Sequence, residues 1–117
     1  MANFTFLFLI PYFLFSMIVY NISTKVPWYI SDEWLIWQQE EYIPEIMQSN
    51  LFDDYKIYRI MDLEEDEGPT YTVQYFTSDK ERYQQYIEEF APILREKAFA
   101  RWGNQLLSFH SAMELVN

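Results

Sequence analysis

His110 is the only histidine in this sequence of 117 residues, and it is a candidate for chemistry near neutral pH. An imidazole can act there as a general base or as an axial haem ligand. Arg59 lies in an otherwise apolar segment, and its planar guanidinium could hold a ligand carboxylate through two parallel hydrogen bonds. The commoner alternative for His110 is a packing or surface position, and for Arg59 it is pairing with a neighbouring acid.

Four aromatic residues, placed in expected helices and strands, could line an apolar ligand pocket between helices and a sheet. They are Tyr20, Trp34, Trp37 and Tyr75. Because 21% of the residues are aromatic, simple core packing is the alternative explanation for each of them. The candidate ligand-binding residues are therefore Tyr20, Trp34, Trp37, Arg59, Tyr75 and His110, and no residue is assigned a catalytic role.

Several other chemistries have no basis in the sequence. There is no cysteine, which excludes disulfides, thiol catalysis and thiolate metal sites. The acidic run 62–67 does not match a calcium-binding EF-hand loop, because a count from Asp62 places Gly68 one position too late. We expect this run to be a solvated hairpin tip, and we predict no metal ion and no cofactor.

The balance of charge limits the partners. The formal net charge is −10, from 18 acidic and 8 basic residues. Nucleic-acid binding normally needs a basic face that displaces counterions from phosphates, and no basic cluster is present. A polybasic anchor for anionic lipids is missing for the same reason. We therefore expect neither nucleic acid nor an anionic membrane surface as a partner, whereas a small-molecule ligand stays possible.

Residues 1–16 differ from the rest of the chain, because they are uncharged and almost wholly apolar. We expect residues 17–117 to form one domain and residues 1–16 to be upstream sequence included by a mis-assigned start before Met17. A membrane anchor or an export signal is the first alternative. However, the apolar run is interrupted by Pro11 and is short for a membrane span, and it lacks a basic start and a small-residue cleavage site. An additional structural element is the second alternative.

The pattern from Met17 onward predicts two matching halves. Alternating residues rich in β-branched and aromatic types predict strands at 18–24, 55–63, 70–77 and 105–116. Apolar residues at helical spacing predict one helix at 33–49, capped by Ser31 or Asp32, and another between a capping box at Ser78 and Gly103.

The expected helices share a further feature, an internal proline at the corresponding place, Pro44 and Pro92. An internal proline deletes a backbone hydrogen bond and distorts a helix, so two helices bent alike are expected. Right-handed crossovers then place both helices on one face of a four-stranded antiparallel sheet. The fold class is α+β, a ferredoxin-like β-α-β-β-α-β domain.

The other face of this sheet needs a partner. Leu107, Phe109 and Met113 lie on one side of the last expected strand, where a solvated face would carry polar residues. A second copy of the chain in a two-fold homodimer is the simplest partner.

Several segments resemble a small bacterial family known as domain of unknown function 4286. They are 17–21, 33–37, Ile43-Pro44, 71–76 and 98–103. The resemblance covers about residues 17–116 and implies the fold and sheet-to-sheet dimer of the dimeric α/β-barrel superfamily. Members often carry a histidine before the Ile-Pro pair, where this sequence has Tyr42, so a role for that histidine does not transfer.

No catalytic motif indicates an activity, and the resemblance implies none. We expect a cytoplasmic, non-enzymatic binding or interaction module. The first alternative is a cofactor-independent or haem-linked monooxygenase or isomerase with a pocket between helices and sheet, and such enzymes occur in the wider superfamily. The second alternative is a domain tethered to a membrane through residues 1–16.

Overall fold

The structure, a computed structural model, describes residues 17–117, so the predictions made for residues 1–16 lie outside the described part. The strands are β1 (Ile18–Lys25), β2 (Asp54–Arg59), β3 (Thr70–Thr77) and β4 (Leu107–Glu114). The first helical region comprises η1 (Trp28–Ile30), α2 (Ser31–Trp37), η2 (Gln38–Tyr42) and α3 (Ile43–Met47). The second comprises α4 (Lys80–Gln85), η3 (Tyr86–Phe90) and α5 (Ala91–Trp102).

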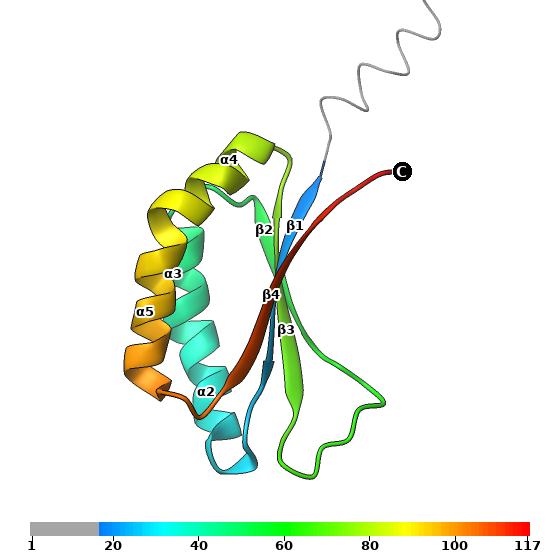
Figure 1. The fold of residues 1–117 in the computed structure, drawn as a ribbon, viewed down its shortest axis with the longest axis vertical. Helices are drawn as coiled ribbons and strands as arrows, with labels where there is room; N and C mark the ends of the chain where they lie inside the picture. The colour runs from blue at the N-terminus through cyan, green and yellow to red at the C-terminus, as the bar shows by residue number, and fades with distance from the viewer. Residues whose placement is uncertain (1–16) are drawn as a thin grey trace, which may run out of the picture.

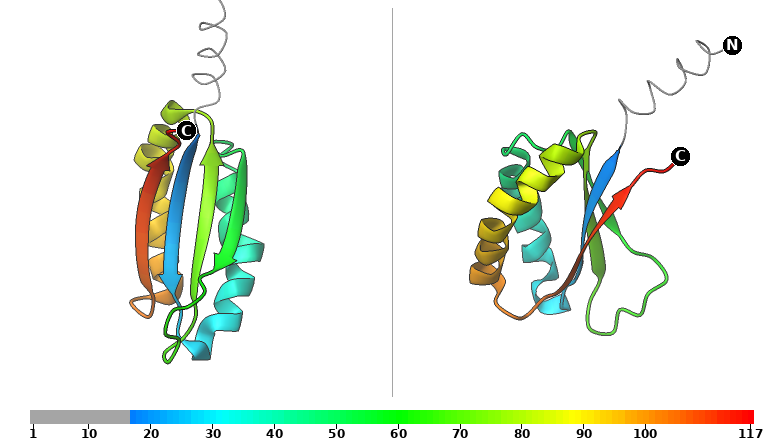
Figure 2. Two further views of the ribbon diagram at one scale, coloured as in Figure 1. Left: turned by 90° about the vertical axis from the view of Figure 1, so that its right-hand side faces the viewer. Right: turned by 45° about the horizontal axis from the view of Figure 1, so that its top comes forward.

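The four strands form one antiparallel sheet in the order β2-β3-β1-β4, and both helical regions cover the same face of it (Figures 1 and 2). The predicted ferredoxin-like fold is therefore confirmed. No helix among residues 17–117 is long and apolar enough to cross a membrane.

Two strands are shorter than predicted because the backbone turns away. The second strand ends at Arg59 rather than at residue 63, since Asp62 has a φ of 63°, which extended backbone does not permit. The last strand begins at Leu107 rather than at residue 105, because Gln105 lies in the preceding turn and donates its side-chain amide to the carbonyl of Trp102 at 2.7 Å.

Each proline is accommodated by a π-helical segment that ends two residues before it. In η2 the N–H of Ile43, the residue before Pro44, donates to the carbonyl of Gln38, five residues back. In η3 the N–H of Ala91, before Pro92, donates to Tyr86 in the same way. This wider turn lets the helix continue although the proline has no N–H to donate to the carbonyl four residues back. The two helical regions thus carry the same irregularity at the same place, as the paired prolines predict.

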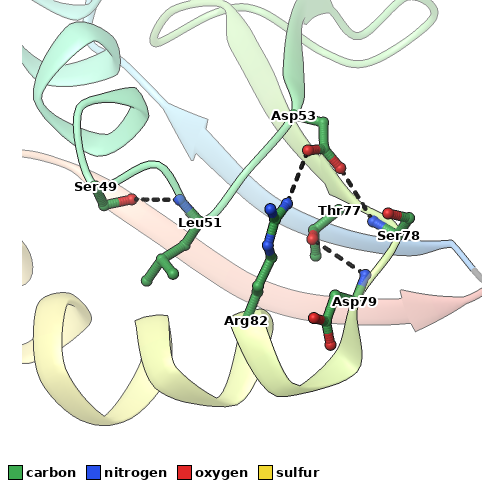
Figure 3. Close-up of polar contacts among 7 residues, drawn as sticks. All are labelled: Ser49, Leu51, Asp53, Thr77, Ser78, Asp79 and Arg82. Carbon is green, nitrogen blue, oxygen red and sulfur yellow. Dashed lines mark hydrogen bonds and ion pairs between the residues drawn. The ribbon is translucent and has the colours of Figure 1, made fainter.

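The predicted caps are wrong in detail. The first helix has no side-chain cap, because a 3₁₀ turn, η1, leads directly into it. The second is capped by Asp79 rather than Ser78, since Asp79 Oδ1 accepts from the N–H of Glu81 at 2.8 Å. The backbone N–H of Ser78 instead donates to Asp53, whose carboxylate also pairs with Arg82 at 2.9 Å (Figure 3). Asp53 therefore links the start of β2 to the start of α4.

Register assigns the side chains of β1 to the two faces. Residues 18, 20, 22 and 24 are buried beneath the helices, and the residues between them face the other side of the sheet. β4 is exposed along its whole length, with Phe109 at 66% exposure opposite Ser23 on this uncovered face. Both faces of the sheet thus carry apolar side chains, as the sequence predicts.

Candidate functional site

A pocket of 240 Å³ lies between the first helical region, α5 and the β1–β4 edge of the sheet. Its size is slightly below the range of about 300–1,000 Å³ typical of sites for drug-sized ligands, which suits a smaller molecule. The lining is mostly aromatic and aliphatic, with a few polar groups. The lining residues are Ile22, Thr24, Trp34, Trp37, Gln38, Tyr42, Arg95, Ala98, Phe99, Gly103, Leu106, Ser108 and His110.

The sheet side of the pocket is set by strand register. Ile22 pairs with His110 and Thr24 pairs with Ser108, so all four side chains lie on the helix-covered face. The hydroxyls of Thr24 and Ser108 lie 3.0 Å apart and share one hydrogen bond. Since that bond uses only one of the two hydroxyl hydrogens, the other can be donated to a ligand.

The helix side of the pocket is set by helical spacing. Trp34 and Gln38 are four residues apart, and Arg95 and Phe99 are also four apart, so each pair shares one helix face. The ring of Trp34 stacks on Tyr71 with centroids 5.4 Å apart. These contacts hold the aromatic wall of the pocket in a fixed position.

Tyr42 completes this wall and has no free hydroxyl hydrogen. Its ring stacks on Trp37 at 4.6 Å, and its hydroxyl donates to the backbone carbonyl of Leu94 at 3.0 Å. Burial raises the pKa of Tyr42. The residue therefore connects the two helical regions and stays neutral.

A hydrogen-bonded chain runs from Arg95 through Tyr20 to His110. Arg95 Nη2 donates to the Tyr20 hydroxyl at 3.1 Å, and that hydroxyl lies 2.6 Å from His110 Nδ1. Burial raises the pKa of Tyr20, and it lowers the pKa of His110 with a further contribution from the positive charge of Arg95. Both members of the pair are thus held neutral at pH 7.

The bond from Arg95 favours one tautomer of His110. A guanidinium only donates, so the Tyr20 oxygen accepts from Arg95, and the hydroxyl hydrogen of Tyr20 is left to donate to His110 Nδ1. The hydrogen of the neutral imidazole is then on Nε2. In this tautomer His110 offers the pocket an N–H donor and no free base lone pair.

We expect His110 to make stability depend on pH. Its pKa in the folded state lies below the value of about 6.5 expected for an unfolded chain. Stability is therefore complete above about pH 6.5 and falls as the pH drops toward the folded-state pKa, because the unfolded chain binds the proton first. Denaturant unfolding between about pH 7.5 and 5 should show this fall for the native protein and a flatter profile for His110→Gln. Parallel profiles would contradict the prediction.

Gln38 places a buried carbonyl oxygen without a hydrogen-bond donor in the pocket lining. The residue is 6% exposed, and its Oε1 has no hydrogen-bond partner among residues 17–117. A buried carbonyl oxygen without a donor costs about 1–3 kcal/mol. A ligand that donates a hydrogen bond to Gln38 would remove this cost.

The structure brings together half of the predicted site residues. Trp34, Trp37 and His110 line the pocket, and Tyr20 lies behind it as the hydrogen-bond partner of His110. Tyr75 is fully buried in the core, where burial raises its pKa well above 10.

Arg59 lies outside the lining and has other partners. Its Nε donates to Glu65 at 3.1 Å, which lowers the pKa of that carboxyl, and its guanidinium lies 5.7 Å from the Trp28 ring centroid. A second ion pair joins the acidic run to the sheet, since Glu67 pairs with Lys25 of β1 at 3.3 Å. Among residues 17–117, no group of three or more His, Cys, Asp or Glu is placed to hold a metal ion.

Sequence reasoning missed Gln38 and Arg95. The four-residue spacing from Trp34 is a usable signal for Gln38, since it places both residues on one helix face. Arg95 has no such local signal, because its partner Tyr20 is 75 residues away in the sequence.

The fold and this pocket define the class of protein: a small ferredoxin-like α+β domain with a partly open site between its helices and its sheet. The chain belongs to the family described as domain of unknown function DUF4286, whose model matches residues 17–116. No curated protein matches the sequence.

Three solved structures share the fold at low sequence identity. An ethyl tert-butyl ether D (EthD) family protein from Bacillus halodurans is 16% identical, with a TM-score of 0.59 and coverage of 80% of this chain and 96% of that one. A dimeric ferredoxin-like protein from an uncultured marine organism is 10% identical, with a TM-score of 0.57 and coverage of 87% and 96%. A mutant of SnoaB, a cofactor-independent oxygenase from Streptomyces nogalater, is 9% identical, with a TM-score of 0.54 and coverage of 86% and 92%.

Proposed function

We propose that this protein is a homodimeric, non-enzymatic module that binds a small molecule in the pocket between its helices and sheet. The observation that carries the proposal is the unpartnered Oε1 of Gln38, a residue that is 6% exposed and lies in a lining that is mostly aromatic and aliphatic. Protein interiors satisfy almost all buried polar groups, so an exception in a pocket wall points to a missing ligand donor.

The state of His110 supports binding over catalysis. A general base needs a free lone pair within reach of the substrate, and in the tautomer with its hydrogen on Nε2 the Nδ1 lone pair of His110 accepts from Tyr20 at 2.6 Å. The remaining nitrogen carries a hydrogen and can only donate while the ring is neutral. This arrangement recognises a ligand acceptor without removing a proton from it.

The second copy of the chain supplies the partner for the uncovered sheet face. Leu107, Phe109 and Met113 project from β4 on this face and are 58%, 66% and 48% exposed, respectively. Exposed apolar side chains gathered on one face are typical of an association surface. The marine relative with the same fold is described as dimeric.

The substitution Gln38→Leu should strengthen the fold and weaken binding at the same time. Leucine removes the buried oxygen without creating a cavity, so the melting temperature should rise by several degrees, equivalent to about 1 kcal/mol. A fragment screen followed by melting temperature should give hits on the native protein that Gln38→Leu loses. This opposition between stability and binding is typical of a binding site.

Gln39→Leu is the matched control, because Gln39 is the next residue of η2 and is exposed. It should leave both the melting temperature and the fragment hits within error. The proposal fails if Gln38→Leu lowers stability, or if no fragment raises the melting temperature of the native protein.

A cofactor-independent or haem-linked oxygenase or isomerase is the second candidate, and the Arg95–Tyr20–His110 chain favours it. If His110 passed its Nε2 hydrogen to a substrate and took the hydrogen of Tyr20 at Nδ1, Arg95 would stabilise the resulting Tyr20 oxyanion at 3.1 Å. The oxygenase SnoaB shares the fold. Turnover of an aromatic substrate that Tyr20→Phe abolishes would establish this function, whereas binding without turnover supports the module.

The cytoplasmic location stays part of the proposal, with tethering through residues 1–16 as its alternative. Fractionation of native cells distinguishes them. Protein in the supernatant, with the mass of a chain that starts at Met17, supports the cytoplasmic location. Protein in the membrane fraction, with the mass of all 117 residues, supports tethering.

A further inference from the structure

The charge pattern around the pocket is unusual for so acidic a chain. Six of the eight basic residues form ion pairs with carboxylates. Arg95 is not among the six, and among residues 17–117 its side chain donates to the neutral Tyr20. Among residues 17–117, its guanidinium has no carboxylate within ion-pair distance.

The surroundings of Arg95 leave room for an anion to take that place. The pocket lining contains no Asp or Glu among the described residues, although the chain has 18 of them. Arg95 uses Nη2 on Tyr20, and a guanidinium has five N–H donors, so several remain for a ligand. The Nε2 hydrogen of His110 and the spare hydroxyl hydrogen of Thr24 and Ser108 are further donors.

The aromatic lining indicates the shape of the rest of the ligand. Trp34 and Trp37 form one wall, and Phe99 lies on α5 four residues after Arg95. Phe99 is 64% exposed despite its position in the lining, so a ligand ring would cover apolar surface that is open to solvent. Flat rings pack well against such side chains.

Resting on the binding function proposed above, we propose that the pocket takes a small aromatic carboxylic acid that also carries a hydrogen-bond donor. The carboxylate pairs with Arg95 and accepts from His110. The ring lies among Trp34, Trp37 and Phe99, and the donor reaches Gln38 Oε1. One ligand then supplies a carboxylate for Arg95 and a hydrogen-bond donor for Gln38 Oε1.

The test uses three probes of nearly equal size with the native full-length protein. Para-hydroxybenzoate has both the carboxylate and the donor, para-hydroxybenzamide replaces the charge with a neutral amide, and benzoate lacks the hydroxyl donor. Titrations are followed by NMR through the indole N–H signals of Trp34 and Trp37. Para-hydroxybenzoate should bind at least about tenfold more tightly than either analogue, as expected for a charge-assisted or a buried hydrogen bond.

Two variants on α5 distinguish a direct effect of the Arg95 charge in the pocket from an effect of the net charge of the protein. Arg95→Gln keeps a donor for Tyr20 and should remove the preference for the acid over the amide. Lys97→Gln loses the same charge two residues away, from an exposed pair with Glu45 at 2.6 Å, and should keep that preference. If both variants lost the preference for the acid to the same extent, the preference would come from long-range electrostatics, and the proposed role of Arg95 would be wrong.

The outcomes also separate this inference from the proposed function. If the amide binds as tightly as the acid, the anionic class is wrong, whereas the binding module stands. If neither acid shifts the tryptophan signals at millimolar concentration, the ligand class is overturned, and neutral fragment hits lost in Gln38→Leu would still support the module. Failure of the acids and of the neutral fragments together overturns both.

Discussion

Phe109→Asp is expected to convert the protein from a dimer into a monomer in solution. The Phe109 side chain is 66% exposed on the uncovered face, opposite Ser23 on β1. In a two-fold dimer the substitution would bury a carboxylate from each chain in an apolar interface, at a cost of several kcal/mol for each charge. Light scattering should give twice the chain mass of 14.3 kDa for the native protein and that mass itself for the variant.

Ile93→Asp is the control for this experiment. Ile93 lies on α5, on the helical side of the molecule, and is also 66% exposed, so it tests the same change of chemistry on the opposite layer. It should leave the protein dimeric. A native protein that is already a monomer, or loss of the dimer in both variants, would contradict the proposed interface.

Gly68→Ala is expected to destabilise the fold by about 3 kcal/mol or more, the largest change in stability of any substitution considered. A Cβ atom at this position would lie 1.8 Å from the backbone oxygen of Val26. The two segments are also joined by a hydrogen bond from the N–H of Val26 to the carbonyl of Pro69 at 2.9 Å. Since the obstructing atom belongs to the backbone, the strand ends must separate to admit the methyl group.

Gly103→Ala distinguishes this steric clash from backbone strain. Gly103 has a φ of +64°, but a Cβ there would meet no atom within 4 Å. The substitution Gly103→Ala should therefore lower the free energy of unfolding only by the cost of an unfavourable backbone conformation, about 1–3 kcal/mol. Denaturant unfolding of both variants measures the difference, and equal losses would mean that the close approach at Gly68 relaxes without cost.

Much of the fold was predictable because local patterns agree with one another. Strand β3 coincides with the alternating segment 70–77, and the paired prolines mark where both helices change their hydrogen bonding. The ends of β2 and β4 were harder to predict. Both depend on backbone conformations, such as the positive φ of Asp62, that a non-glycine residue type does not reveal.

The candidate site was predictable only in part, for a related reason. Trp34, Trp37 and His110 stand out by residue type, and the structure places them in one lining. The role of Gln38 depends on which helix face meets the sheet, and the role of Arg95 follows from a pairing between distant elements. Only the register of β1 with β4 and the packing of α5 over β1 bring Arg95 to Tyr20 and Tyr20 to His110.

The π-helical segment η2 lets two functions of one helix be adjusted separately. α2, before it, carries the tryptophans of the pocket wall, and α3, after it, carries Ile43 and Ile46 of the buried core. Each residue advances an α-helix by about 100°, and the wider π turn absorbs about one such residue, so loss of one residue within η2 would restore regular winding while α2 and α3 keep their mutual orientation. The core contacts of α3 and the positions of Trp34 and Trp37 would then persist, and only the side chains of η2 itself, Gln38 among them, would be displaced. A single-residue deletion at this point is therefore a short route to a relative with the same fold and a different polar group in its ligand site.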